Sequence, residues 1–218
     1  MVKQGHNFNP ETFFSTAGAG RDLVSFQKGQ SLFAQGDASD AVFVVLAGIV
    51  RLSAKSRGGK EATLDILVKH DFVGKDSIAD QSIRTTSAKA LTDCQLLRID
   101  KKVMMLALAQ EVTLSNAFCA YLLTRSLRYR QDLVEQRCDT SEERLACILL
   151  RLAHLEAQGL QETTIPKIPQ ETLAEMVGTT RSRISFFLNK FRESGFIDYS
   201  TKSQMMEIHH SLVAICAQ

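Results

Sequence analysis

Hydrophobic and polar residues recur with two different periods along the chain, and the change falls near Asp100. Before it, short apolar or alternating segments are separated by glycine and aspartate, which is typical of β-strands joined by turns. The strands predicted in this way are 23–27, 31–35, 41–46, 49–54, 62–68 and 94–99, and 57–60 is predicted as a hairpin tip. Short strands at this spacing predict a small barrel or roll.

After Asp100 the period becomes helical. Steps of four and three residues trace one stripe along a helix of roughly 25 residues. The stripe is Ser115, Cys119, Leu122, Ser126, Tyr129, Leu133 and Gln136. Its two serines and its glutamine make a weak zipper, so the helix could instead pack only on its own barrel. We favour a homodimer seam, because so long a helix needs more cover than one small domain provides.

Two breaks follow the long helix. Residues 138–140 end it, and Thr140 with Glu143 three residues later is a capping-box pattern that predicts a new helix through Gln158. A hinge between domains is expected here. Residues 159–169 contain two of the three prolines and predict a second linker.

The stretch 170–191 has the pattern of two helices that cross at a tight turn. Ala174 is small where the helices would touch, and Gly178 occupies the turn, where a left-handed backbone favours glycine. The side chains predicted to point inward are Leu173, Val177, Ile184, Phe187 and Leu188.

The outward face of the second helix is basic, since residues 179–192 include four basic and no acidic side chains. Such a face suits a phosphate backbone, and the arginine fork matches guanine O6 and N7. We assign Arg181 as the base reader beside Ser182 and Ser185, with Arg183 and Lys190 on the DNA backbone. The candidate DNA-binding residues are Gln170, Thr179, Thr180, Arg181, Ser182, Arg183, Ser185, Asn189 and Lys190. Residues 196–208 predict a two-stranded wing, with Lys202 as a further backbone contact.

Composition limits the remaining classes. The chain is 44% hydrophobic and 23% charged, as in ordinary globular proteins, and its apolar runs are too short to span a membrane. No signal-peptide pattern opens it, so a cytoplasmic location is expected. The five cysteines contain no CxxC pair, which argues against a disulfide framework, a zinc site or an iron–sulfur site and favours reduced thiols.

The order of strands, long helix and helix-turn-helix, with the motif QETLAEMVGTTRSR at 170–183, closely resembles the Crp/Fnr superfamily of bacterial transcription regulators. The resemblance covers roughly residues 20–210. It implies a β-roll effector domain of the cyclic-nucleotide-binding type, dimerisation through the long helix, and DNA sites that are inverted repeats. Ser182 and Phe186 stand where relatives often have glutamate and arginine, so the recognised sequence is expected to differ.

In relatives that bind cyclic AMP, a Gly-Glu-Leu turn and an Arg-Ser pair hold the phosphate, and a Thr-Ser pair on the long helix touches adenine. Here Lys75 replaces the glutamate, and Tyr129 and Arg130 replace the Thr-Ser pair. The candidate effector residues are Gly74, Lys75, Asp76, Ser77, Arg84, Thr85, Thr86 and Tyr129. A cyclic nucleotide or another small anion is a possible effector; alternatively, Arg84 only pairs with an acid such as Asp76 or Asp80.

Other effectors lack their ligands in the sequence. No cysteine precedes Cys94, which argues against an iron–sulfur cluster, and His70 is the sole histidine between residues 7 and 153, which argues against haem. His209 and His210 have no second ligand pair nearby, so no metal is expected. Cys119, on the seam, is a candidate redox switch across the dimer axis, against the alternative of a small buried hydrophobe.

We therefore predict an α+β protein with a jelly-roll-like sensor domain at 1–110, a dimerisation helix at 111–138 and a winged helix-turn-helix at 139–218. The expected function is transcription regulation by a homodimer that binds double-stranded DNA, with RNA polymerase as a further partner and no membrane. The alternatives are the same regulator without a small ligand, either constitutive or redox-controlled through Cys119, and a cupin-type enzyme. The enzyme would need clustered His and Glu ligands that residues 23–99 lack.

Overall fold

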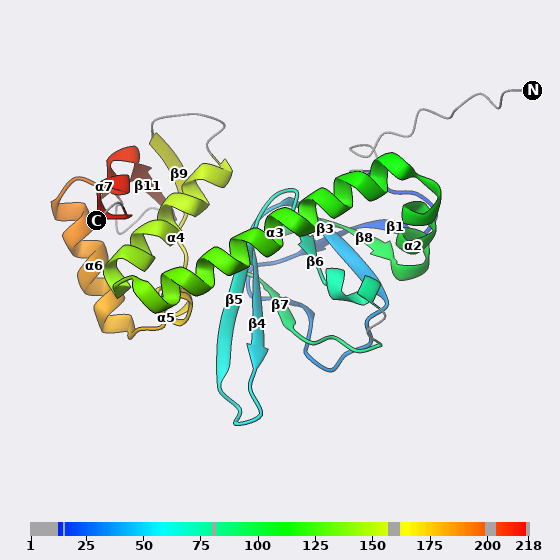
Figure 1. Cartoon of the computed structure of the whole chain (residues 1–218), viewed down its shortest axis with the longest axis horizontal. Coiled ribbons are helices and arrows are strands. Elements are labelled where there is room, and N and C mark those ends of the chain that lie inside the picture. Colours follow the sequence, from blue (N-terminus) through cyan, green and yellow to red (C-terminus); the bar gives the residue numbers. More distant parts are fainter. Residues whose placement is uncertain (1–12, 15, 80–81, 157–161, 199–203, 217–218) are drawn as a thin grey trace, which may run out of the picture. The chain divides into compact units, whose positions relative to one another are not determined.

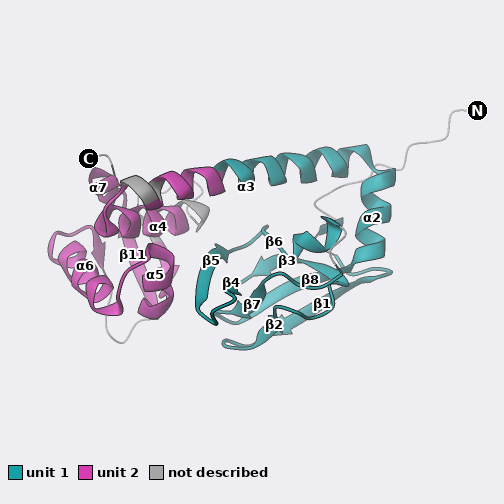
Figure 2. Ribbon diagram, turned by 60° about the horizontal axis from the view of Figure 1, so that its bottom comes forward, with its two compact units in different colours: residues 1–127 teal, residues 128–218 magenta. Residues whose placement is uncertain are grey.

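The computed structural model describes residues 13–14, 16–79, 82–156, 162–198 and 204–216 (Figure 1). The chain divides into two compact units at Leu127 and Arg128, inside the long helix (Figure 2). The fold is mixed α+β, with a β-rich first unit and a second unit that contains helices and a small sheet.

The first unit is built on two antiparallel sheets. One has the order β1-β8-β3-β6 and the other β2-β7-β4-β5. The strands are β1 (Arg21–Phe26), β2 (Ser31–Phe33), β3 (Ala41–Ala47), β4 (Val50–Lys55), β5 (Glu61–Leu67), β6 (Phe72–Val73), β7 (Ser87–Ala90) and β8 (Cys94–Asp100). The short helix η1 (Lys75–Ala79) follows β6. This arrangement confirms the predicted roll.

Two apolar layers stabilise the roll, and together they explain why β3 is apolar at successive positions. Phe43 and Val45 face a core shared by both sheets. Val42 and Val44 face a second core, with Met104 of α2 (Lys101–Gln110) and Phe118 of α3 (Val112–Cys138). Because both faces of β3 are buried, its sequence lacks the alternation of a half-exposed strand.

The second unit begins with the last part of α3. After it come α4 (Ser141–Glu156), β9 (Glu162–Pro166), α5 (Gln170–Val177), α6 (Arg181–Glu193), β10 (Ile197–Asp198) and β11 (Met205–His209). The short η2 (His210–Leu212) and α7 (Val213–Cys216) end the described chain. The strands form one antiparallel sheet in the order β10-β11-β9.

The capping box at the start of α4 is confirmed. The Thr140 N–H donates to Glu143 Oε2 at 2.6 Å, and the Glu143 N–H donates to Thr140 Oγ1 at 3.3 Å. Hydrogen bonds from the backbone N–H and the side chain of Thr140 to the Glu143 carboxylate hold the pKa of this carboxyl below its ordinary value. The box therefore sets where the second unit's first complete helix begins.

Three details correct the sequence predictions. β6 and β7 were not predicted, because β6 has only two residues and β7 reads Ser-Ala-Lys-Ala, which lacks β-branched and aromatic side chains. The segment expected to be a linker contains β9, and β9 makes the expected two-stranded wing a sheet of three. Lys202 and Asp80 lie outside the described residues.

Within the described residues, no single helix has the length and apolar character to cross a membrane. The bent pair Lys101–Gln110 and Val112–Val134 meets that test only when its two helices are taken together.

Candidate nucleic-acid interface and effector cassette

Helices α5 and α6, together called the reading module below, meet as the sequence predicts. Leu173, Val177 and Ile184 are at most 1% exposed, and Phe187 and Leu188 are also buried. Gly178 ends α5 with φ 72° and ψ 42°, the left-handed conformation that glycine adopts without strain. Thr180 begins α6 by accepting a hydrogen bond from the Arg183 N–H. The predicted inward wedge and the tight turn are therefore confirmed.

The opposite side of α6 is exposed to solvent. Ser182, Phe186 and Asn189 follow one another at helical spacing on this face, and Phe186 is 64% exposed. Arg181 lies at its start, with its Nε 3.1 Å from Glu171 Oε1 and both side chains largely exposed. Such an exposed ion pair contributes little, so the arginine can exchange it for another partner.

Among the remaining predicted DNA-binding residues, Lys190 and Arg183 contact other side chains of the second unit. Lys190 Nζ lies 2.7 Å from Glu142 Oε1 of α4, and the Arg183 guanidinium lies 5.7 Å from the centre of the Phe187 ring. Ser185, Thr179 and Gln170 are half-buried.

Arg144 attaches α4 to the reading module. Its Nε donates to the Val177 carbonyl, at the end of α5, at 2.9 Å, and its Nη1 donates to the Asp139 carbonyl at 2.5 Å. Because one guanidinium joins the start of α4 to the α5–α6 turn, the angle between these helices is fixed by polar contacts as well as by apolar packing.

The candidate effector residues of the roll, 74–77 and 84–86, are called the cassette below. Its centre is the buried arginine Arg84. Arg84 is 2% exposed and donates to the Gly74 carbonyl at 3.1 Å and to the Ala41 carbonyl at 2.6 Å. It also lies 4.3 Å from the centre of the Phe33 ring, and its Nη2 is 3.8 Å from an Asp40 carboxylate oxygen. Burial lowers the pKa of its guanidinium.

The glycine of the cassette has a steric role. Gly74 has φ +71°, and a Cβ atom there would lie 2.3 Å from Arg84 Nη1. Only glycine therefore allows the Arg84 guanidinium its observed place. Next to it, Asp76 accepts a hydrogen bond from the Thr85 hydroxyl at 2.9 Å. The buried Ser77 hydroxyl has no hydrogen-bond partner among the described residues.

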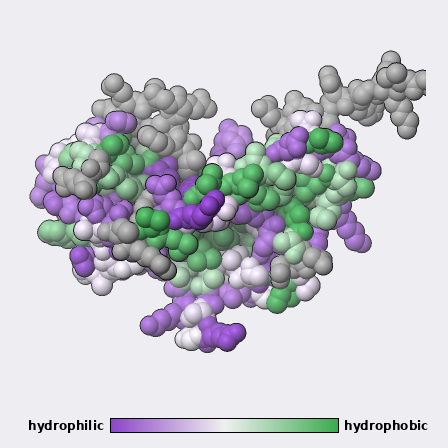
Figure 3. Space-filling model, viewed as in Figure 1, coloured by the Kyte–Doolittle hydropathy of each residue, from purple (hydrophilic) through white to green (hydrophobic). Residues whose placement is uncertain are grey.

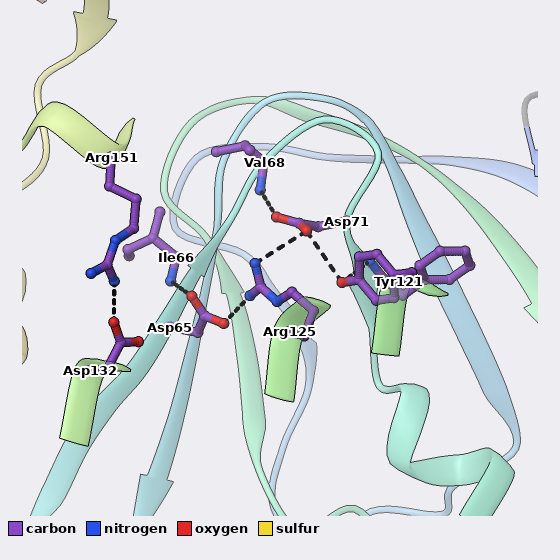
Figure 4. A network of polar contacts seen from close by, with 9 residues as sticks. Asp65, Ile66, Val68, Asp71, Tyr121, Arg125, Asp132 and Arg151 are labelled. Carbon is purple, nitrogen blue, oxygen red and sulfur yellow. Dashed lines mark hydrogen bonds and ion pairs between the residues drawn. The ribbon is translucent and has the colours of Figure 1, made fainter. Parts of the chain in front are cut away.

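A second buried charge was not predicted from sequence. Arg125 of α3 forms ion pairs with Asp65 of β5 and with Asp71, and all three side chains are buried (Figure 4). The Tyr121 hydroxyl donates to Asp71 Oδ1 at 3.2 Å and accepts from the Phe72 N–H at 3.1 Å. Burial, followed by the charge of Asp71, raises the pKa of the Tyr121 hydroxyl. This cluster fastens the first half of α3 to the roll.

Burial and the charges of Arg125, Asp65 and Asp71 shift the pKa of Lys75. Burial lowers the pKa of its ammonium group and the Arg125 charge lowers it further, while Asp65 and Asp71 oppose that shift. Lys75 therefore lies within the electrostatic field of the Arg125, Asp65 and Asp71 cluster.

The long helix presents a separate apolar surface. Leu123 and Leu127 are 67% and 60% exposed, and Leu122 and Cys119 are also exposed. Figure 3 shows hydrophobic side chains gathered over this helix. Of the other predicted seam residues, Ser126, Leu133 and Gln136 are exposed and Tyr129 is half-buried. Ser115 is half-buried and donates to the Leu108 carbonyl of its own unit.

Sequence reasoning missed Leu123, Leu127 and Val134, which lie beside the predicted stripe and are each at least 60% exposed. The sequence contained the signal, because the stripe displaced by one residue places Leu123, Leu127 and Val134 on one face. The candidate DNA-binding residues also omit Phe186, although this residue lies four positions after Ser182 on the exposed face of α6.

The described residues contain no group of three or more His, Cys, Asp or Glu side chains that could hold a metal ion. His70 is exposed in a turn with φ 72°.

A buried-arginine cassette in a β-roll and an exposed helix in a winged module define a class of DNA-binding regulators, and comparison with known proteins agrees. The cyclic nucleotide-binding domain family matches residues 23–111, and the Crp-like helix-turn-helix domain family matches residues 143–210. The chain belongs to the Crp/Fnr family, whose members are transcription regulators and not enzymes.

Individual relatives resemble most of the chain. The cyclic AMP receptor protein of Thermus thermophilus is 32% identical over 79% of this chain and 77% of its own length. A CRP-like cAMP-activated global transcriptional regulator of Mycobacterium tuberculosis is 27% identical over 84% and 83%. The structure of FixK2 from Bradyrhizobium japonicum superposes with a TM-score of 0.75 at 17% identity, covering 89% of this chain and 95% of that one.

Proposed function

We propose that this regulator is a bacterial cytoplasmic homodimer that binds inverted-repeat DNA through α6 and works with RNA polymerase. The observation that carries the proposal is the division of α6 into a buried inner face and an exposed face that begins with Arg181. In functional terms, residues 1–110 would sense, 111–138 would dimerise and 139–218 would read DNA.

On DNA, four exposed side chains of α6 would have distinct roles. The Arg181 fork would leave Glu171 for guanine O6 and N7, while Ser182 and Asn189 donate to base edges or phosphates. Phe186 offers an apolar surface to a thymine methyl group. In a two-fold dimer the two α6 helices would enter successive major grooves roughly 34 Å apart.

The dimer would form along α3. Exposed leucines at successive helical turns are the surface that a second copy of the helix buries, and their burial favours association by roughly 25 cal/mol per Å² of apolar area. Analytical ultracentrifugation of a Leu123→Asp, Leu127→Asp double variant tests this. We expect the double variant to sediment as a monomer with a folded circular-dichroism spectrum, and a stable dimer would contradict the seam.

We propose that the β-roll controls DNA binding, with a cyclic nucleotide or another small anion as the candidate effector. The basic side chains of Arg84 and Lys75 support an anion. To bind one through Arg84, however, the ligand would have to displace the Gly74 and Ala41 carbonyls.

That same displacement favours a second candidate, a regulator that needs no small ligand. Arg84 and Arg125 already have internal partners, and these partners stabilise the roll without an effector. In one form of this candidate, redox control acts through Cys119, which is exposed on the seam. Two symmetry-related thiols would lose two hydrogens to a peroxide and form a disulfide between subunits.

Two experiments in sequence separate the two candidates. The first is calorimetric titration with cyclic AMP, cyclic GMP and related nucleotides, and the second is DNA selection with and without the ligand that binds most tightly. Binding that disappears in Arg84→Ala supports effector control, whereas equal DNA selection under all conditions supports the second candidate. A non-reducing gel of oxidised Cys119→Ser tests the redox form, because a dimer band that persists removes Cys119. A purified dimer that ignores every duplex at low salt would overturn the DNA-binding proposal itself.

A further inference from the structure

Two cysteines that lie 69 residues apart in sequence meet inside the second unit. The Cys147 thiol of α4 donates to Cys216 Sγ of α7, with the two sulfur atoms 2.7 Å apart. Both side chains are half-buried. Small movements would therefore bring the sulfurs to bonding distance, which is about 2.05 Å in a disulfide.

The cysteines of the first unit have different surroundings. Cys94 is buried, its thiol donates to the Ile49 carbonyl at 3.3 Å, and burial raises its pKa. Cys119 is exposed on α3. Because a thiolate is the form that reacts, the buried Cys94 is protected, and Cys119 provides an accessible control thiol on another element.

The positions of Cys147 and Cys216 would make a bond between them consequential. The loop that it closes contains β9, α5, α6, β10 and β11, which together are the whole reading module and its sheet. Its first end lies on α4, three residues after Arg144, whose guanidinium binds the end of α5. A cross-link over such a long loop restricts the unfolded chain strongly.

We propose that Cys147 and Cys216 are a redox-active dithiol that closes to a reversible disulfide and fastens α7 to α4. With hydrogen peroxide, one thiol becomes a sulfenic acid and releases water. The second thiol then displaces the sulfenic oxygen as another water molecule, so that two electrons pass from sulfur to peroxide. Glutathione disulfide performs the same oxidation by exchange and leaves two glutathione thiols.

The effect of this bond is stabilisation of the reading module, with its DNA-contacting surface left open. The pair joins α4 to α7, whereas the exposed face proposed to read DNA belongs to α6. Oxidised protein is therefore expected to bind duplex DNA within about twofold of reduced protein, and to keep that activity to a higher temperature.

The experiment equilibrates the full chain in glutathione buffers from fully reduced to fully oxidised, blocks the remaining thiols by rapid alkylation and maps peptides by mass spectrometry. We expect a linked pair of peptides that contain Cys147 and Cys216 and have lost two hydrogens, and we expect dithiothreitol to remove it. Cys147→Ser and Cys216→Ser should each abolish the link, and Cys119→Ser should retain it. Full alkylation of both cysteines at the oxidising end would overturn the proposal.

Thermal melting supplies a second readout. The melting temperature of the second unit should rise by roughly 10 °C on oxidation of the wild type and should stay unchanged in either serine variant. Under dithiothreitol all these proteins should melt alike, which shows that the serine variants fold. A linked peptide without any rise in melting temperature would contradict the stabilising role.

Discussion

The arginines singled out in the two units of this regulator differ in how far they are exposed to solvent. In the second unit, Arg181 is 69% exposed and its partner Glu171 is also exposed. In the first unit, Arg84 and Arg125 are at most 5% exposed, and each binds carbonyls or carboxylates of the same unit. The difference teaches that the face of α6 proposed to bind DNA is available as it stands, whereas the arginines of the roll are buried and already held by partners of their own unit.

The largest expected effect tests the roll side of this comparison. Arg125→Ala leaves Asp65 and Asp71 buried without a counter-charge and should lower the free energy of unfolding by about 3–5 kcal/mol. Urea denaturation followed by circular dichroism measures it. The control is Arg98→Ala, which removes pairs with the more exposed Asp40 and Asp100 and should cost about 1 kcal/mol or less. Equal losses in the two variants would show that burial does not decide how much these ion pairs of the roll contribute.

The next effect tests the reading side. Arg181→Ala should weaken DNA binding by about 1–3 kcal/mol and relax base preference at one position in each half-site. Lys190→Ala is the matched control, because it removes a cation that pairs with Glu142 and should weaken all sequences about equally. The measurement is fluorescence anisotropy across single-base variants of the selected site. An unchanged base preference in Arg181→Ala would assign the reader elsewhere.

Phe186 sharpens the reading side further. Its contact with a thymine methyl group should contribute about 0.8 kcal/mol, the value of one buried methylene. Replacing thymine by uracil at the contacted position removes the methyl group from the DNA. Wild-type protein should lose affinity by this change and Phe186→Ala should not, and equal losses in both proteins would show that the ring does not touch that base.

The smallest effect concerns the Glu143 carboxylate of the capping box. Its pKa is lowered in the folded protein, so the stability that it contributes is present above its ordinary value of 4.5 and is lost as the pH falls below it. Glu143→Gln keeps a hydrogen-bond acceptor for the Thr140 N–H but does not titrate. We expect wild type to have the higher free energy of unfolding above pH 4.5 and the difference between the two proteins to disappear in acid, as measured by urea denaturation at several pH values. A constant difference at all pH values would remove the capping box from the acid response.

The reading module could be predicted closely from sequence because its constraints are local. Gly178, the inward leucines and the Thr140 box depend on neighbours a few residues away, and periodicity records such neighbours. The Arg125 cluster could not be predicted, because Asp65 and Asp71 come from strands and turns that only the roll brings to α3. The same holds for Cys147 and Cys216, whose separation in sequence resembles no known spacing. The boundaries of the shortest strands also escaped, because two to four residues show no period.

The sheet of the second unit has a consequence for how a signal could arrive. β9 precedes the two reading helices and β11 follows them, and the two strands pair along five positions from Pro166 with Met205 to Glu162 with His209. The segments that enter and leave the module are thus held together by strand pairing. Arg144 also joins the end of α5 to α4 by a hydrogen bond. Because both of its ends are held, we expect the module to move as a rigid body. Control of this regulator should therefore change the orientation of α6 and leave its conformation unchanged.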